Sequence, residues 1–154
     1  MSKSMLNTKD NVRHISIIKK TASRICATQV IYGASFVEND IDFLIKSYTD
    51  NYLPLILKEL GIRQIDSDLF IAITKGVFIN MLIIDKIISK HLSIKWSFNR
   101  LSETEKSVLR LATYELCFDK RFNKITIINE YISIIESFGG NTNFANGILE
   151  NISK

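Results

Sequence analysis

The sequence predicts an all-α protein, on two observations. Apolar residues recur at every third or fourth position through most of its 154 residues, which is the period of an amphipathic helix. The chain also has one Pro and only six Gly, so few positions would interrupt a helix. A chain of this length buries enough apolar surface for one domain. No stretch reaches the roughly 18 uninterrupted apolar residues of a membrane span, so no membrane association is expected.

The first half of the chain predicts helices that follow a polar start. Residues 1–16 lack a helical apolar period and are expected to form a mobile N-terminal extension, leaving 17–154 as one folded domain. The first helix is expected over Ile17–Phe36 and a shorter one over Asp42–Tyr48. Pro54 limits any helix around it to a first turn or a kink. A long helix then runs from Asp66 or Ser67 to about His91.

The second half begins with a connector at Ser93–Asn99 that holds Trp96, the single Trp, which is interpreted as a core anchor. The next helix carries its own start signal. Ser102 can accept a hydrogen bond from the amide of Glu105, while the Glu105 side chain reaches back to the Ser102 amide, as in a capping box.

The last third predicts two more helices. The Ile-rich run from Lys124 keeps a spacing of three and four, which favours a helix over a strand despite its β-branched residues. Gly139 and Gly140 end it. A short final helix starts between Asn141 and Asn143. About seven helices are expected in all.

Positive charge is concentrated near the N-terminus. The net charge is +4, and residues 1–37 alone carry six basic side chains and one acidic one, which gives +5. Within the first helix Lys20, Arg24, Thr28 and Tyr32 recur at every fourth position and are expected to form one exposed stripe. Cations followed by an aromatic ring suit contact with phosphates and stacking on unpaired bases. A solvated basic tail is the alternative.

The residues needed for catalysis or metal binding do not cluster. His14 and His91 have no ligand partner three or four positions away, and no Gly-rich phosphate-binding loop is present. We therefore expect no catalytic residue, no metal site, no cofactor and no enzyme activity. Cys26 and Cys117 lie among apolar residues and are expected to be buried thiols of a cytoplasmic protein.

Five sequence blocks, in a fixed order, resemble the NusB family. They are S-R-I-C-A-T-Q-V-I-Y (Ser23–Tyr32), R-L-S-x-x-E-K-x-V-L-R-L-A-x-Y-E-L (Arg100–Leu116), I-N-E (Ile128–Glu130), S-F-G (Ser137–Gly139) and F-x-N-G-I-L (Phe144–Leu149). The resemblance implies a helical bundle of two subdomains that acts as an RNA-binding transcription antitermination factor. It also implies binding to single-stranded boxA RNA of ribosomal RNA leaders, together with the ribosomal protein NusE, within the RNA polymerase antitermination complex.

The resemblance assigns roles residue by residue. The positions implied to contact RNA are Lys19, Lys20, Arg24, Gln29, Tyr32, Phe144 and Asn146. Core packing is the alternative for Phe144. Glu105 falls where the family meets NusE, whereas Arg110 and Glu115 are expected to form intramolecular ion pairs. Two departures from the family pattern are a thinned arginine tract in the first helix and a shortened loop between Phe138 and Phe144.

Two other functions are considered. A non-catalytic scaffold would keep the ribosomal protein partner and have weakened RNA specificity, which would agree with the thinned arginine tract. An RNA-binding accessory domain of a ribosomal RNA methyltransferase is disfavoured, because the 154 residues contain no cofactor-binding α/β domain.

Overall fold

The computed structural model describes the backbone of residues 2–154 and the side chains of residues 12–154. Within that range the chain forms eight α-helices, a 3₁₀ turn and a π-helical turn, without a strand, so the all-α prediction is confirmed. The elements are α1 Ser2–Ala34, α2 Ile41–Asn51, α3 Leu53–Leu60, α4 Ser67–Ile79, α5 Met81–His91, η1 Phe98–Arg100, α6 Glu103–Tyr114, η2 Glu115–Asp119, α7 Lys124–Ser137 and α8 Thr142–Ser153.

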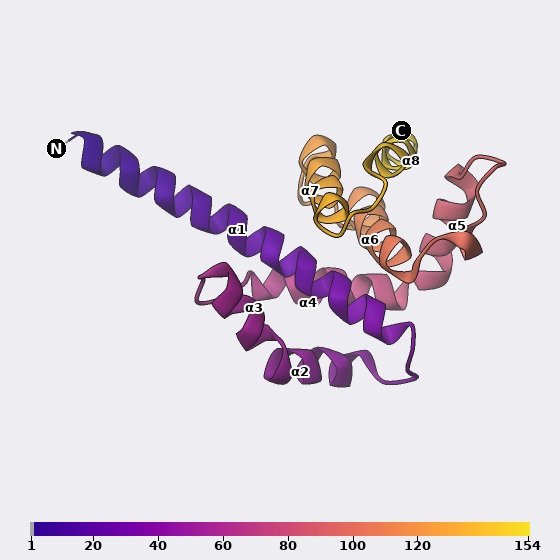
Figure 1. Ribbon diagram of the computed structural model, residues 1–154, viewed down its shortest axis with the longest axis horizontal. Helices are drawn as coiled ribbons and strands as arrows, with labels where there is room; N and C mark the ends of the chain where they lie inside the picture. The colour runs from indigo at the N-terminus through magenta and orange to yellow at the C-terminus, as the bar shows by residue number, and fades with distance from the viewer. Residues whose placement is uncertain (1) are drawn as a thin grey trace.

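Helices α1, α4 and α6 pack against one another at the centre of the molecule. Figure 1 shows α2 and α3 on one side of α1 and α4, and α6, α7 and α8 on the other side. The N-terminal half of α1 extends beyond this body. Seven of the eight helices contribute buried apolar side chains to one continuous core, and α3 contributes partly buried ones.

Side-chain caps fix where most helices begin. The N-cap residues whose side chain accepts a backbone N–H are Asp40, Asp66, Ser102, Asn123 and Asn141. At α6 the N–H of Glu105 donates to Ser102 Oγ at 3.1 Å, which confirms the first half of the predicted capping box. The second half differs, because the Glu105 carboxylate accepts from the Ser102 hydroxyl at 3.0 Å.

Two further local predictions are confirmed. Pro54 lies in the first turn of α3, where its missing N–H leaves no hydrogen bond unmade. At the end of α7, Gly139 has φ +79° and Gly140 N–H donates to Ile135 O at 3.0 Å. A glycine in the left-handed region is the usual way to turn the chain out of a helix.

The single long helix predicted from Asp66 or Ser67 to His91 is wrong. The segment is two helices, α4 and α5, bent by 79° at Asn80. The Asn80 amide group donates to Gly76 O at 2.8 Å, alongside the Asn80 backbone N–H at 3.1 Å. An Asn side chain that bonds nearby backbone competes with helix continuation. Because the apolar period continues through the bend, periodicity alone could not reveal it.

Helix α1 begins earlier than predicted. Its backbone is helical from Ser2, whereas the sequence predicted a helix from Ile17. Val12, Ile15 and Ile17, which lie in the part of this stretch whose side chains are described, are exposed. The expected mobility of residues 1–16 stays a prediction.

Two other expectations concern the thiols and the membrane. Cys26 is buried, Cys117 is half-buried, and burial raises the pKa of both thiols. Among the described residues, no single helix has the length and apolar content to cross a bilayer. Only the sharply bent pair α4 and α5 would reach those values together.

The crossing of α4 and α6 gives a prediction for Gly76, with Gly33 of α1 as the control. A Cβ on Gly76 would lie 2.0 Å from Cζ of the Tyr114 ring, whereas a Cβ on Gly33 would have no heavy atom within 4 Å. We expect Gly76→Ala to lower the free energy of unfolding by about 1–3 kcal/mol. Gly33→Ala should raise it by up to about 1 kcal/mol, because alanine favours a helix. Urea unfolding of the two variants measures both, and equal midpoints would contradict the close approach.

Candidate nucleic-acid interface

The two lysines at the predicted start of the basic stripe lie on α1 and are half-buried. Lys20 Nζ donates to Ser16 Oγ at 3.0 Å, one turn back on the same helix. Lys19 lines a hollow of about 350 Å³ formed with the loop before α4, where Asp66 and Asp68 also lie. Lys19 shares this hollow with two carboxylates, but neither Lys19 nor Lys20 forms an ion pair with a described side chain.

Arg24, predicted to be an exposed RNA contact, is 1% exposed, and this part of the prediction is wrong. Its guanidinium forms a two-pronged ion pair with Glu115, with Nε 2.8 Å and Nη2 3.0 Å from the two carboxylate oxygens. Glu130 Oε2 lies 3.7 Å from Nη1. The cation also lies against the Phe122 ring, 5.0 Å from its centroid. No donor of this group points to solvent, so it is part of the core.

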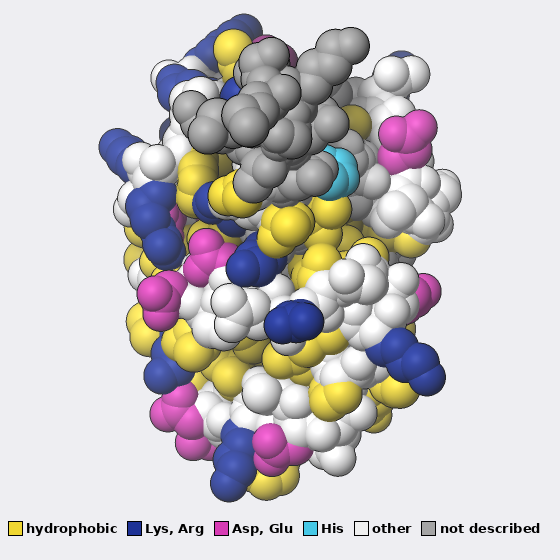
Figure 2. Space-filling view, turned by 90° about the vertical axis from the view of Figure 1, so that its left-hand side faces the viewer, with side chains coloured by type: hydrophobic (Ala, Val, Ile, Leu, Met, Phe, Trp, Pro, Cys, Tyr) yellow, Lys and Arg dark blue, Asp and Glu magenta, His cyan; other side chains and the backbone are white. Residues whose placement is uncertain are grey.

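The geometry of the helix explains the error. With 3.6 residues per turn, positions four apart drift by about 40° at each step, so the face rotates by about 120° between Lys20 and Tyr32. Tyr32 is 41% exposed, while Arg24 and Thr28 are buried between those two ends. The stripe therefore passes beneath the helices that pack on α1. Figure 2, seen from the side where α1 protrudes, shows Lys and Arg scattered among acidic and apolar side chains.

The buried pair joins three elements. Glu115 belongs to η2, a π-helical turn that follows α6, and Tyr131 of α7 donates its hydroxyl proton to Glu115 Oε2. Burial alone would lower the pKa of Arg24, but hydrogen bonds and charge from Glu115 outweigh it and raise the pKa. Burial and the Glu115 charge raise the pKa of Tyr131 well above its ordinary value. Arg24 and Tyr131 therefore keep the protons that they donate to Glu115.

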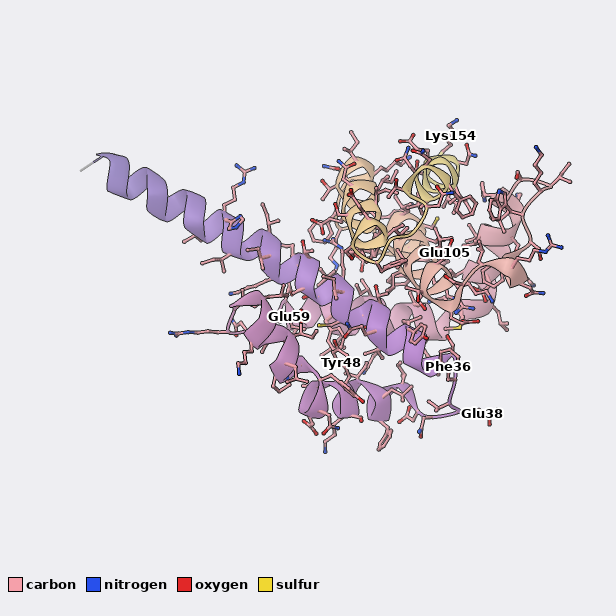
Figure 3. All side chains as sticks on the ribbon, viewed as in Figure 1. Phe36, Glu38, Tyr48, Glu59, Glu105 and Lys154 are labelled. Carbon is pink, nitrogen blue, oxygen red and sulfur yellow. The ribbon has the colours of Figure 1, made fainter. Side chains whose placement is uncertain are left out.

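Gln29 and Tyr32 lie away from the lysines, in a groove of about 670 Å³ between α1, α2 and α3. Tyr48 and Tyr52 of the α2–α3 hairpin form its opposite wall, and Tyr48 Oη donates to Gln29 Oε1. Burial raises the pKa of Tyr48, which keeps its hydroxyl a donor. In Figure 3 Tyr48 and Glu59 lie on this hairpin, and Phe36 and Glu38 lie in the loop that follows the C-terminal end of α1.

The segment that carries α2 and α3 is negatively charged overall, and its Glu59 lines the groove. Residues 33–60 contain five carboxylates and two lysines, a net charge of −3. The carboxylates are Glu38, Asp40, Asp42, Asp50 and Glu59. Of these, Asp42 is paired with Lys75 at 2.8 Å. A phosphate would be repelled here, so uncharged bases rather than phosphates suit the Gln29 and Tyr32 side chains.

Phe144 and Asn146 lie on α8, across the molecule from the groove (Figure 1). Phe144 is half-buried and Asn146 is exposed. The Phe144 ring packs against Trp96, with 4.9 Å between ring centroids. Trp96 is 45% exposed, so its interpretation as a core anchor is wrong. Apart from the buried Arg24, the predicted RNA contacts thus lie in three separate places: at the two lysines of α1, in the groove, and on α8.

The intramolecular ion pairs expected of Arg110 and Glu115 are confirmed, each with its own partner. Arg110 Nε and Nη2 lie 2.8 Å and 2.9 Å from the carboxylate oxygens of Asp85 on α5, and Glu115 pairs with Arg24. Glu105 is half-buried at the start of α6 and accepts the Ser102 hydroxyl. Among the described side chains, no three His, Cys, Asp or Glu residues converge as metal ligands would.

Sequence reasoning missed one part of this surface. The segment from Lys86 to Ser102 carries four Lys and Arg residues and no Asp or Glu. The charge pattern holds this signal, which is weaker than the excess of five positive charges over residues 1–37.

Known proteins similar to this chain belong to the family that the five sequence blocks resemble. A sequence model of the NusB family matches residues 21–154. A relative from Fervidobacterium nodosum, named transcription antitermination protein NusB, is 48% identical over 82 residues, which are 52% of this chain and 57% of that protein. This chain therefore matches little more than half the length of that curated relative.

Solved structures show the same fold. The structure of T. maritima NusB is 32% identical, has a TM-score of 0.63 and covers 86% of this chain and 89% of its own. A crystal structure of antitermination factors NusB and NusE in complex with dsRNA contains a chain that is 24% identical, with a TM-score of 0.68, covering 86% and 94%.

The buried ion pair predicts a large difference between neighbouring cations of α1. Arg24→Met leaves the Glu115 carboxylate buried without its partner and should lower the free energy of unfolding by about 3–5 kcal/mol. Lys20→Ala, the matched control, should change it by no more than about 0.5 kcal/mol. Adding Glu115→Leu to Arg24→Met removes the unpaired charge and should recover part of the loss. Chemical denaturation measures all three, and a neutral Arg24→Met would refute the structural role.

Proposed function

Because this chain belongs to the NusB family, we propose that it is a transcription antitermination factor that binds RNA together with a ribosomal protein. The RNA is the single-stranded boxA element of ribosomal RNA leader transcripts, and the protein partner is NusE. In this role the chain joins the RNA polymerase antitermination complex and supports processive synthesis of ribosomal RNA. The family match over residues 21–154 carries the proposal.

The chemistry of the chain supports RNA as a ligand. Lys20 has no carboxylate partner among the described side chains, and Lys19 lies next to it, so both offer charge to phosphates. Gln29 supplies hydrogen bonding and Tyr32 an exposed ring, while on α8 Asn146 supplies hydrogen bonding and Phe144 a half-buried ring. Arg24 supports this function indirectly, by holding α1 against η2 and α7.

A scaffold function is the second candidate, and the burial of Arg24 favours it. The basic tract at the start of the predicted first helix has only one arginine, Arg24, and that side chain is buried. Two half-buried lysines, Lys19 and Lys20, are what this part of α1 can offer to RNA. Fewer phosphate contacts mean weaker RNA binding and a weaker dependence on salt. Such a protein would bind NusE but would not distinguish boxA RNA from other RNA.

RNA titration at several salt concentrations separates the two candidates. With NusE present, an antitermination factor should bind boxA RNA more tightly than a scrambled RNA at moderate salt. Lys19→Ala with Lys20→Ala should weaken binding and reduce the salt slope by about 1 to 1.5 units, as expected for two single-strand phosphate contacts. The control, Lys46→Ala with Lys58→Ala, removes two exposed lysines of α2 and α3 and should leave the slope unchanged. Equal affinity for both RNAs, with NusE still bound, would support the scaffold instead.

Glu105 gives a test of the protein partner. Glutamine also completes a capping box, so Glu105→Gln keeps the cap of α6 and removes one charge. We expect the NusE affinity to fall while the free energy of unfolding stays within about 0.5 kcal/mol. Ser102→Ala is the matched comparison and should cost about 1 kcal/mol of stability through loss of the cap. Calorimetric titration with NusE measures the affinity, and an unchanged value for Glu105→Gln would remove this residue from the interface.

A further inference from the structure

Trp96 and Phe144 lie where the connector between α5 and α6 meets the start of α8. Their ring centroids are 4.9 Å apart and their planes are inclined by 39°. Trp96 is 45% exposed although it packs on Phe144, so much of the indole faces solvent. Ile94, two residues earlier, is fully exposed, so the connector is not folded into the core at this point. An indole held on one side and open on the other provides a stacking surface.

The chain segment that contains Trp96 is positively charged. The segment from Lys86 to Ser102 has four cations and no carboxylate, and all four cations are exposed. They are Lys86, Lys90, Lys95 and Arg100. None of them forms an ion pair with a described side chain. The adjacent carboxylate, Asp85, is neutralised by Arg110 at 2.8 Å.

The neighbouring part of α8 adds no negative charge. Residues 137–149 contain neither Asp nor Glu, and the first turn of α8 has no acidic side chain. The unpaired N–H groups at the start of a helix carry partial positive charge, which adds to that of the connector. Asn141 uses its side chain to cap the N–H of Phe144 at 3.0 Å, and Asn146 lies exposed on the same helix.

From this arrangement we propose that Trp96 and Phe144 form a stacking site for an unpaired RNA base. The adjoining phosphates are held by Lys86 and Lys90 of α5 and by Lys95 and Arg100 of the α5–α6 connector, a group called the connector cations. Aromatic rings next to unpaired cations are the combination that binds single-stranded nucleic acid with little regard to sequence. The inference rests on the proposed RNA-binding function and extends it to a residue and a connector outside the predicted contacts. The bound strand is then held by two cationic regions, one on α1 and one on this connector.

The single Trp of the chain makes the site directly observable. The full-length protein is titrated with single-stranded boxA RNA while Trp fluorescence and electrophoretic mobility are followed in parallel. Stacking should quench the fluorescence over the same RNA concentrations that shift the mobility. A fully paired duplex of the same sequence should quench much less, because its bases are not free to stack. Binding without quenching, or equal quenching by the duplex, would overturn the inference and leave RNA binding itself intact.

Variants separate stacking from packing. Trp96→Ala should weaken binding of the single strand by roughly 5- to 100-fold, the range expected for loss of one stacked base. Trp96→Phe keeps a ring and should retain most of the affinity. Lys90→Gln with Lys95→Gln should weaken binding and reduce its salt dependence, whereas Lys46→Gln with Lys58→Gln should do neither. Wild-type affinity in Trp96→Ala would overturn the proposal, whereas absence of RNA binding in the wild type would refute both it and the proposed function.

An acidic peptide is the other ligand that such a cationic surface could take. A polyglutamate peptide of matched charge serves as the competitor in the same fluorescence titration. We expect it to leave the RNA-induced quenching in place, because glutamate side chains have no π-face to stack on the indole. Displacement of RNA by this peptide at equal concentration would show that charge alone operates, and would also overturn the stacking site.

Discussion

The buried ion pair between Arg24 and Glu115 is the constraint on which the arrangement of the helices depends. Two charges removed from water are tolerated only when their geometry is good and their remaining hydrogen-bonding capacity is used. Here the carboxylate accepts two N–H groups of Arg24 and the hydroxyl of Tyr131, and Glu130 lies near the remaining guanidinium nitrogen. Helix α1 is thereby held to η2 and α7 at a single register. The π-helical turn of η2 follows directly from α6 and carries Glu115 at its first position.

The same interaction divides the positive charge of the protein. By drawing Arg24 into the core, it leaves Lys19 and Lys20 as the described cations at the solvent side of that part of α1. Further along the helix, the groove at Gln29 and Tyr32 is walled by α2 and α3, which belong to a segment of net negative charge. The connector cations therefore add positive charge that this part of α1 does not supply. Together with the Trp96 ring and the start of α8, which Asn141 caps, they form a second positively charged surface.

Local signals in the sequence predicted most helices, and long-range contacts account for what it missed. The Ser102 cap, the first-turn Pro54 and the Gly139 terminus depend only on residues a few positions away. The bend at Asn80 could not be predicted in that way, because apolar residues continue at helical spacing on both sides of it. Arg24 looked like a surface cation for a similar reason, since its partner Glu115 lies 91 residues away in sequence. The position of Trp96 also depended on tertiary structure, because only the packing of α8 shows which side of the ring is covered.

The separation of the candidate contacts limits how RNA could be bound. From Lys20 to Tyr32 the rise along α1 is about 18 Å, and the exposed face rotates by about 120° over that distance. A rigid duplex could not follow such a path while also reaching α8, whereas a flexible single strand could pass around the molecule. Repulsion from the carboxylates of α2 and α3 would keep its phosphates away from the groove, so that Gln29 and Tyr32 would meet bases. The distribution of charge on this fold thus favours an unpaired strand whose phosphates contact α1 and the α5–α6 connector.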